Sequence, residues 1–435
     1  MRYKKSTLDN GIRVVSAAIP NSRASSVGVL VEAGPFSEES DQGGLAHLCE
    51  HLLFQGTSSR SALDIANMMD GAGGQVGGAT SRDYTCYYAL TTDDYTTYAL
   101  DLLGDVLLNP IFPQAAVESE KRAICCEIEG REDDPAQHVH HLLKENVWAG
   151  NPLGRSITGT RESVECLTRE DLIYFLHCHY QPERIVLAGA GNLDHEDFVA
   201  HVRDAFWRMI PSNIGPRPSQ PALFCPGLAL RPAPISQAYF SLAFEAPSYT
   251  AENRYSVHLL ARLLGGGLSS RLHRRLRDEK GLVYDVHASY QAYKDGGLLM
   301  IEGATVPPNL VLVLSEIFDE LTDLGSWRRP ATEDELMRAK AQLRAQIILS
   351  GEDSHSLMSR LATQELYFGH YLPEEDLLAG IDHVCGESLK KLVTDDLNFS
   401  ADKAALAVVA PEAPADYDSA ILLDLLQRQE LPVYL

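Results

Sequence analysis

The sequence predicts an α+β protein built from two homologous α/β-sandwich domains, each with a mixed, antiparallel-rich sheet and helices packed on it. Apolar residues recur at helical spacing in six long segments: 44–55, 61–72, 93–108, 114–133, 307–325 and 332–350. Shorter alternating apolar runs, such as 84–90, are typical of strands. Because helices and strands are mixed rather than strictly alternating, we expect antiparallel-rich sheets with helices on one face.

Prolines concentrate near the middle of the chain. They crowd the segment 211–221 and continue at positions 226, 232 and 234. Such a density fits neither a helix interior nor a central strand. We therefore expect one domain at 1–210, a linker at 211–235 and a second domain at 236–435. Each half begins with a strand-like run followed by a helix, which favours an internal duplication.

Composition excludes several classes of protein. The chain has 435 residues, 45% of them hydrophobic, so it can bury at least two substantial cores. Its 37 Lys and Arg against 60 Asp and Glu give a net charge of −23, which argues against binding nucleic acid. No apolar run approaches the roughly 20 residues of a membrane-spanning helix, so no membrane role is expected.

The expected location is the cytoplasm. The basic start at Met1 leads directly into a strand-like run at 12–16, without the apolar stretch or cleavage site of a signal peptide. The 8 cysteines are sparse and form no Cys-x-x-Cys pair. They are interpreted as reduced thiols.

The segment 43–54 contains the pattern His47-Leu-Cys-Glu50-His51 within a helical apolar stretch. Residues four apart share a helix face, so His47 and His51 can bind one ion. Zinc in catalytic sites takes three protein ligands and a water. Glu50 is close enough to that face to accept the proton of the water.

A third ligand is expected from the helical segment 114–133. Glu120 and Glu127 are seven residues apart and therefore share a face, with apolar residues such as Ile124 beside them. Glu127 as the ligand and Glu120 as a supporting carboxylate form a coherent pair. From the residues alone, Glu120, Glu127 and Glu129 remain alternatives.

Three segments of the sequence resemble a known family. The run GGLAHLCEHLLFQGT at 43–57, the Glu127 helix and the segment NPLGRSITGT at 151–160 look like the pitrilysin family of zinc peptidases, which carry the inverted motif His-x-x-Glu-His. Within that family the chain is most similar to bacterial proteins related to the β subunit of the mitochondrial processing peptidase. The resemblance implies one zinc per chain.

The second half carries a further element of the resemblance. Arg277 and Tyr284 are similar to an arginine and tyrosine pair of the family. A guanidinium and a phenol are suitable donors for a substrate carbonyl or for the oxyanion formed from it. Family architecture implies that the pair reaches the zinc of a partner chain in a closed chamber. Because this chain carries both motifs, a homodimer is expected.

One segment departs from the family pattern. Gly77 and Gly78 occupy the positions of the usual Asn-Ala at the strand that pairs with substrate. Pairing through the backbone remains available, whereas positioning of substrate by an asparagine side chain does not. The departure bears on specificity more than on reaction type.

Two further histidine clusters stand out, at 138–141 and 177–179. Neither has an acidic or thiolate partner in register, so a second metal site is not predicted.

The sequence as a whole predicts a zinc metalloendopeptidase that cleaves peptides or unfolded polypeptide segments. One alternative is a non-catalytic assembly subunit, although such relatives usually lose the metal motif. Another is a catalytic subunit that needs a distinct partner chain. The natural substrate, the cleavage preference and the choice between maturation and degradation do not follow from the sequence.

Overall fold

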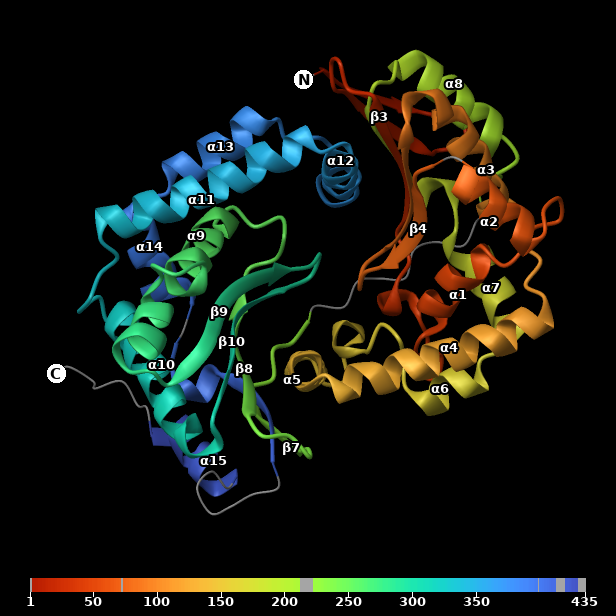
Figure 1. Ribbon diagram of the computed structural model, residues 1–435. Coiled ribbons are helices and arrows are strands. Elements are labelled where there is room, and N and C mark those ends of the chain that lie inside the picture. The colour runs from red at the N-terminus through yellow and green to blue at the C-terminus, as the bar shows by residue number, and fades with distance from the viewer. Residues whose placement is uncertain (1, 72, 212–221, 398, 412–418, 429–435) are drawn as a thin grey trace. The chain divides into compact units, whose positions relative to one another are not determined.

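The computed structural model describes residues 2–71, 73–211, 222–397, 399–411 and 419–428 (Figure 1). The chain divides into two compact units. Unit 1 comprises Met1–Glu129, Arg155–Pro218 and Ile348–Leu372, and unit 2 comprises Gly130–Gly154, Ser219–Ile347 and Pro373–Leu435. Each unit contains one sheet with helices packed against it, as the sequence predicts.

The sheet of unit 1 has six strands in the order β1-β2-β6-β3-β5-β4. Their bounds are β1 Arg2–Thr7, β2 Arg13–Ala18, β3 Ala24–Val31, β4 Gln75–Thr80, β5 Thr85–Thr92 and β6 Ile185–Gly191. The pair β2–β6 is parallel and the other pairs are antiparallel. Strand β4 lies at one edge of this sheet.

The sheet of unit 2 has five strands in the order β7-β11-β8-β10-β9. Their bounds are β7 Gly227–Pro232, β8 Ala238–Ala246, β9 Val283–Ala292, β10 Gly297–Thr305 and β11 Ala405–Ala410. Only β7–β11 is parallel. Strand order and directions repeat those of β2, β6, β3, β5 and β4, so the predicted pair of homologous domains is confirmed.

Helices bury an apolar stripe against each sheet. Those of unit 1 are α1 Leu45–Leu53, α2 Ala62–Gly71, α3 Thr96–Leu108, α4 Gln114–Asp133, α6 Arg161–Cys166, α7 Arg169–His179 and α8 His195–Phe206. Those of unit 2 are α9 Arg254–Gly265, α10 Leu310–Gly325, α11 Glu333–Glu352, α13 Glu374–His383, α14 Gly386–Lys391 and α15 Ser419–Arg428. Helices α4 and α11 each run across a boundary between the units. The six predicted helical segments all form.

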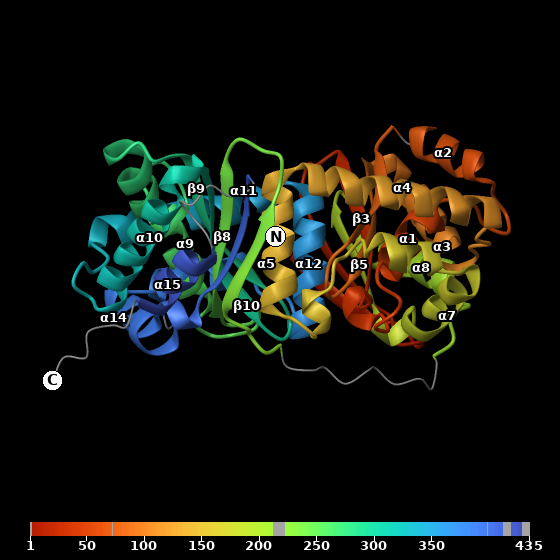
Figure 2. The same cartoon turned by 90° about the horizontal axis from the view of Figure 1, so that it is seen from below.

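Two helices are exchanged between the halves of the sequence. Helix α5 (Pro135–Val147) packs on β8 and β11 of unit 2, and α12 (Ser354–Phe368) packs on β2, β3 and β6 of unit 1 (Figure 2). Met358 of α12 approaches β3 so closely that a Cβ atom at Gly28 would collide with it. The sequence does not predict this exchange, because helical periodicity shows that a helix is amphipathic but not which sheet it covers.

The proline-rich segment contains a strand that the sequence does not predict. Residues 212–221 of the expected linker lie outside the described residues, but 227–232 within it form β7. Strand β7 is an edge strand, and Pro232 is its last residue, where a missing N–H costs little.

Within the described part of the chain, no helix combines the length and the apolar character that crossing a bilayer would require.

Candidate metal centre

Helix α1 holds the two histidines because its other face is apolar. Its buried residues are Leu45, Ala46, Leu48, Cys49, Leu52 and Leu53. Their burial fixes the rotation of the helix about its axis, so His47, Glu50 and His51 lie on the opposite, half-buried face.

Glu38 caps the start of α1. The residue before the helix, Gly44, has a positive φ of 89° and no side chain to cap with. Glu38, which is fully buried, accepts hydrogen bonds from the backbone N–H of Ala46 at 2.8 Å and of Gly44 at 3.2 Å. Burial raises the pKa of the Glu38 carboxyl to about 8, although these two hydrogen bonds act in the other direction. Sequence reasoning missed this residue, because it lies outside the metal motif.

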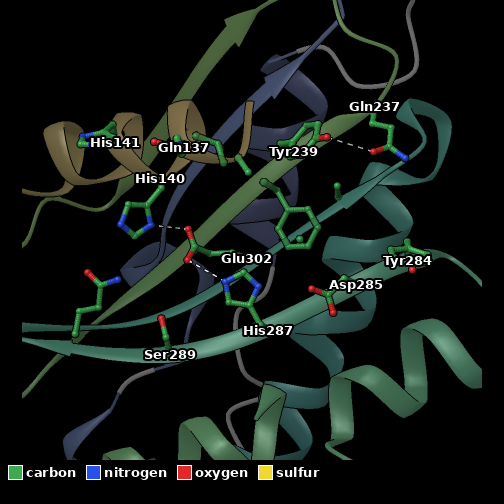
Figure 3. Close-up of a pocket in the computed structure, with 16 residues that line it drawn as sticks. Gln137, His140, His141, Gln237, Tyr239, Tyr284, Asp285, His287, Ser289 and Glu302 are labelled. Atoms are coloured by element: carbon green, nitrogen blue, oxygen red, sulfur yellow. Dashed lines mark hydrogen bonds and ion pairs between the residues drawn. The ribbon is translucent and has the colours of Figure 1, made fainter. Parts of the chain in front are cut away.

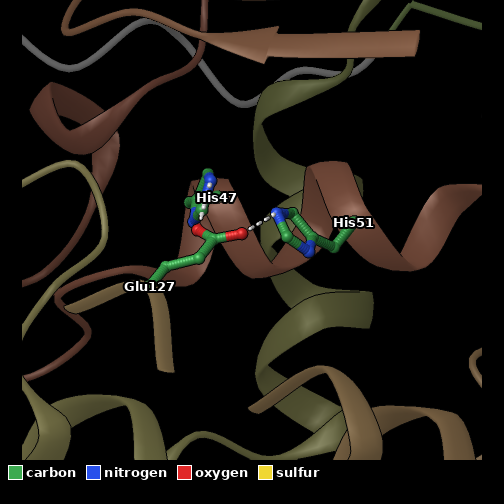
Figure 4. A group of neighbouring side chains, drawn as sticks. All are labelled: His47, His51 and Glu127. Atoms are coloured by element: carbon green, nitrogen blue, oxygen red, sulfur yellow. Dashed lines mark ion pairs between the residues drawn. The ribbon is translucent and has the colours of Figure 1, made fainter. Parts of the chain in front are cut away.

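His47, His51 and Glu127 converge (Figure 4). The carboxylate of Glu127, on α4, lies 3.8 Å from Nε2 of His47 and 3.7 Å from Nε2 of His51. One ligand atom from each residue lies within 4.8 Å of the others. Among the described residues, this is the one group of three or more His, Cys, Asp or Glu side chains found at such spacing.

Glu120 fixes the orientation of His51. Its Oε2 lies 3.0 Å from Nδ1 of His51, and its Oε1 accepts a hydrogen bond from Gln55 at 3.1 Å. A carboxylate accepts only, so Nδ1 of His51 carries the hydrogen, and Nε2 is the nitrogen that faces Glu127. Glu129 instead pairs with Arg161. The three alternatives left open by the sequence therefore have different neighbours.

The donor set fits zinc. Two imidazole nitrogens and one carboxylate oxygen are three ligands of the types that catalytic zinc takes. The Nδ1–H of His51 bound to a carboxylate is also the usual support for a metal-binding histidine.

Glu50 lies beside the two histidines and next to strand β4. The hydroxyl of Thr80 donates to its Oε2 at 2.6 Å. Burial raises the pKa of the Glu50 carboxyl, and the hydrogen bond from Thr80 partly offsets this. A Cβ atom at Gly78 would stand only 2.7 Å from Oε1 of Glu50, so the glycine that departs from the family pattern leaves room for this carboxylate.

Arg277 and Tyr284 lie together in unit 2. Arg277 belongs to a π-helical turn, His273–Glu279, and Tyr284 lies near the start of β9. The guanidinium carbon is 5.0 Å from the centre of the Tyr284 ring, and its Nη1 donates to His273 at 3.1 Å. Tyr284 is 80% exposed, so its hydroxyl is accessible to a ligand.

Comparison with known proteins finds matches to one peptidase family. A family model described as "Insulinase (Peptidase family M16)" matches residues 13–161, and one described as "Peptidase M16 inactive domain" matches residues 167–343. An uncharacterized zinc protease of Mycobacterium leprae is 38% identical over 94% of this chain and 92% of its own length. The chain belongs to peptidase family M16. Another relative of this M16 chain, an uncharacterized zinc protease of Bacillus subtilis, is 33% identical over 94% of this chain and 98% of its own length.

Solved structures confirm the M16 fold. The peptidase M16 inactive domain from Pseudomonas fluorescens superposes with a TM-score of 0.87 at 21% identity, covering 95% of this chain and 99% of that chain. A chain of complex III2 from Candida albicans superposes with a TM-score of 0.81 at 21% identity, covering 97% and 99%. At such identities the likeness is one of fold.

Proposed function

We propose that this M16 chain is a zinc metalloendopeptidase that hydrolyses peptides or unfolded polypeptide segments. The observation that carries the proposal is the convergence of His47, His51 and Glu127, which come from two helices and are far apart in the sequence. The bacterial relatives of the chain bear the name zinc protease, and their similarity extends over nearly its whole length.

In this proposal, Nε2 of His47, Nε2 of His51 and the Glu127 carboxylate would hold one zinc ion per chain. Bound zinc would act as a Lewis acid toward a substrate carbonyl and would lower the pKa of a water. Glu50 takes the proton of the attacking water and delivers it to the leaving amine. The hydrogen bond from Thr80 holds the Glu50 carboxylate in one orientation, so little reorganisation precedes proton transfer.

Arg277 and Tyr284 are proposed to donate hydrogen bonds to the substrate carbonyl and to the oxyanion that forms from it. We further propose that two copies of the chain form a homodimer around a closed chamber, in which the pair of one copy serves the metal of the other. Substrate is proposed to extend the sheet at the β4 edge through backbone hydrogen bonds, because Gly77 and Gly78 offer no side chain for that purpose.

The cytoplasm is the proposed location. All 8 cysteines are free thiols, which suits a reducing compartment.

The test of the proposal is Glu50→Gln. This variant should keep about one zinc per chain by mass spectrometry but lose hydrolysis of a quenched fluorescent peptide library, because an amide cannot accept the proton of the water. His47→Ala should lose both zinc and hydrolysis. In the unmodified protein, o-phenanthroline should abolish cleavage and added zinc should restore it. Hydrolysis by Glu50→Gln at the unmodified rate would remove Glu50 from the role of base.

A non-catalytic assembly role is the second candidate. It is favoured by the likeness to a chain of complex III2, which is one part of a larger assembly. A purified chain that holds neither zinc nor peptidase activity would support it. Zinc without hydrolysis would instead point to a distinct partner chain, and size-exclusion chromatography of the single chain tests the homodimer directly.

A further inference from the structure

The histidine cluster at 138–141 finds an acidic partner in the fold. His140, on α5, hydrogen-bonds through Nδ1 to Oε1 of Glu302 on β10 at 2.9 Å. His287, on β9, lies with its Nε2 3.4 Å from the other carboxylate oxygen, Oε2 (Figure 3). Among the described residues these side chains do not form a group at metal-binding spacing, so they are not assigned a cation.

A pocket of about 780 Å³ surrounds this cluster within unit 2. Strands β8, β9 and β10 form one side and α5 forms another. Tyr284 lines the pocket together with His287, which lies three residues further along β9. Val139, Tyr239 and Phe240 supply apolar surface. The volume is in the range of a small-molecule site.

The buried carboxylate of the pocket already has partners. The carboxylate of Glu302 also accepts a hydrogen bond from Ser241 at 2.9 Å, in addition to its two histidine neighbours. Burial alone would raise the pKa of Glu302, but its hydrogen bonds from His140, His287 and Ser241 outweigh burial and hold the pKa below its ordinary range. A charged ligand group would lose its hydration in this pocket, and the Glu302 carboxylate is already paired with other side chains. Asp285 also lines the pocket, but it is exposed and screened by water.

Neutral hydrogen-bonding groups remain for a ligand. The Ser289 hydroxyl oxygen is buried and has no hydrogen-bond partner among the described residues, so it is available to a ligand. The amide oxygens of Gln237 and Gln291 accept from Tyr239 and Tyr293 at 3.4 and 3.3 Å, which leaves their amide nitrogens to donate. Hydroxyl and amide groups of this kind match a ligand that both donates and accepts.

We propose that this pocket is a substrate subsite that selects an uncharged polar side chain, glutamine or asparagine, of the peptide. This inference rests on the proposed peptidase function, because Tyr284, the proposed donor to the substrate carbonyl, lines the same pocket. A side-chain amide satisfies the Ser289 hydroxyl and the glutamine amides together. An apolar side chain of equal length leaves them unpaired, and a charged one is buried without a partner.

The first test is a positional-scanning library of quenched fluorescent peptides carrying Gln, Asn, Glu, Lys or Leu at each position in turn. At one position, Gln or Asn should raise kcat/KM at least about tenfold over Glu, Lys and Leu. Ser289→Ala and Gln237→Leu should each lower kcat/KM for the Gln and Asn peptides more than for the Leu peptide, so that the preference shrinks. Ser326→Ala, an exposed serine of unit 2 outside the pocket, serves as the matched control. A preference for Glu, Lys or Leu, or no preference at any position, would overturn the proposal.

A second measurement separates this inference from the proposed function. Fluorescence anisotropy of labelled Ala-rich octapeptides, each with one Gln or one Leu, reports binding to Glu50→Gln protein without any turnover. Tighter binding of a Gln peptide that weakens several-fold in the double variant with Ser289→Ala supports the subsite even if the chain hydrolyses nothing. Equal binding of Gln and Leu peptides at every position would exclude the subsite even if the chain is an active peptidase.

Discussion

Three carboxylates lie close to His47 or His51, and each has different neighbours. Glu127 faces Nε2 of both imidazoles. Glu120 accepts a hydrogen bond from Nδ1 of His51, and Glu50 accepts one from the Thr80 hydroxyl. In the proposed function these three carboxylates are therefore a ligand, a support for a ligand and a base. The three carboxylates differ in the side chains that they contact, and those contacts are set by the position of each glutamate on its helix.

Glu120→Gln should weaken zinc binding without unfolding the chain. The amide oxygen can accept a hydrogen bond from His51 or from Gln55, but the side chain no longer carries two negatively charged oxygens. The His51 imidazole is therefore held less firmly and is a weaker base. We expect zinc affinity to fall by about 10- to 100-fold, measured by competition with a chromophoric chelator. Glu118→Gln is the matched control, because Glu118 lies on the same helix, is exposed and contacts Gln114 and Lys121 instead. Equal losses in both variants would contradict a role of Glu120 through His51.

At the scale of the element, helix α1 depends on a residue from the preceding loop. A glycine at its N-cap permits the positive φ but leaves the first backbone N–H groups without a side-chain acceptor. Glu38 supplies the acceptor from a loop, and Arg155 donates in turn to the Glu38 backbone oxygen at 2.5 Å. Arg155 belongs to the segment 151–160 that resembles the family, so this segment supports the helix that carries the two candidate metal ligands.

Glu38→Ala should destabilise the chain by about 3 kcal/mol, because it removes two capping hydrogen bonds and leaves buried N–H groups unpaired. Glu38→Gln keeps one acceptor and should be affected less. The raised pKa of Glu38 gives stability that is fully present below its ordinary value of 4.5 and is lost as pH rises through about 8. Melting temperatures of the unmodified protein should therefore fall relative to Glu38→Gln between these pH values. A constant difference across that range would contradict the raised pKa.

At the scale of the whole molecule, the exchanged helices make the two halves of the sequence interdependent. Helix α12, from the second half, buries Leu357, Met358, Leu361 and Ala362 against the sheet of unit 1. Its Glu365, also fully buried, pairs with Lys5 on β1 at 2.8 Å. Without this helix, one face of that sheet would expose residues such as Val15, Leu30 and Val186 to water.

A fragment of residues 1–210 should therefore aggregate or remain partly unfolded when expressed alone. Appending residues 348–372 through a flexible linker should restore a cooperative thermal transition, since burial of each large side chain contributes about 1.5–3 kcal/mol. A scrambled version of the same 25-residue segment is the matched control. A monomeric, cooperatively folding 1–210 fragment would show that α12 is dispensable for unit 1.

Local sequence patterns are enough to predict the long helices and the metal motif. Helical periodicity located the long helices, because apolar spacing reflects the buried face of each helix wherever that helix packs. His47 and His51 followed from their spacing on one helix, and the proposed role of Glu50 from its place between them. These are local relations within one or two helical turns, so they can be read along the chain.

Contacts between residues that are distant in sequence are visible only in the folded chain. In the folded chain Glu127, rather than Glu129, lies near the two histidines, and Glu38 accepts hydrogen bonds at the N-terminus of α1. His140 and His287 both contact Glu302. Helices α5 and α12 each pack on the sheet of the opposite half. No periodicity encodes these relations, because they arise when separate apolar faces are buried together and thereby fix which polar groups meet.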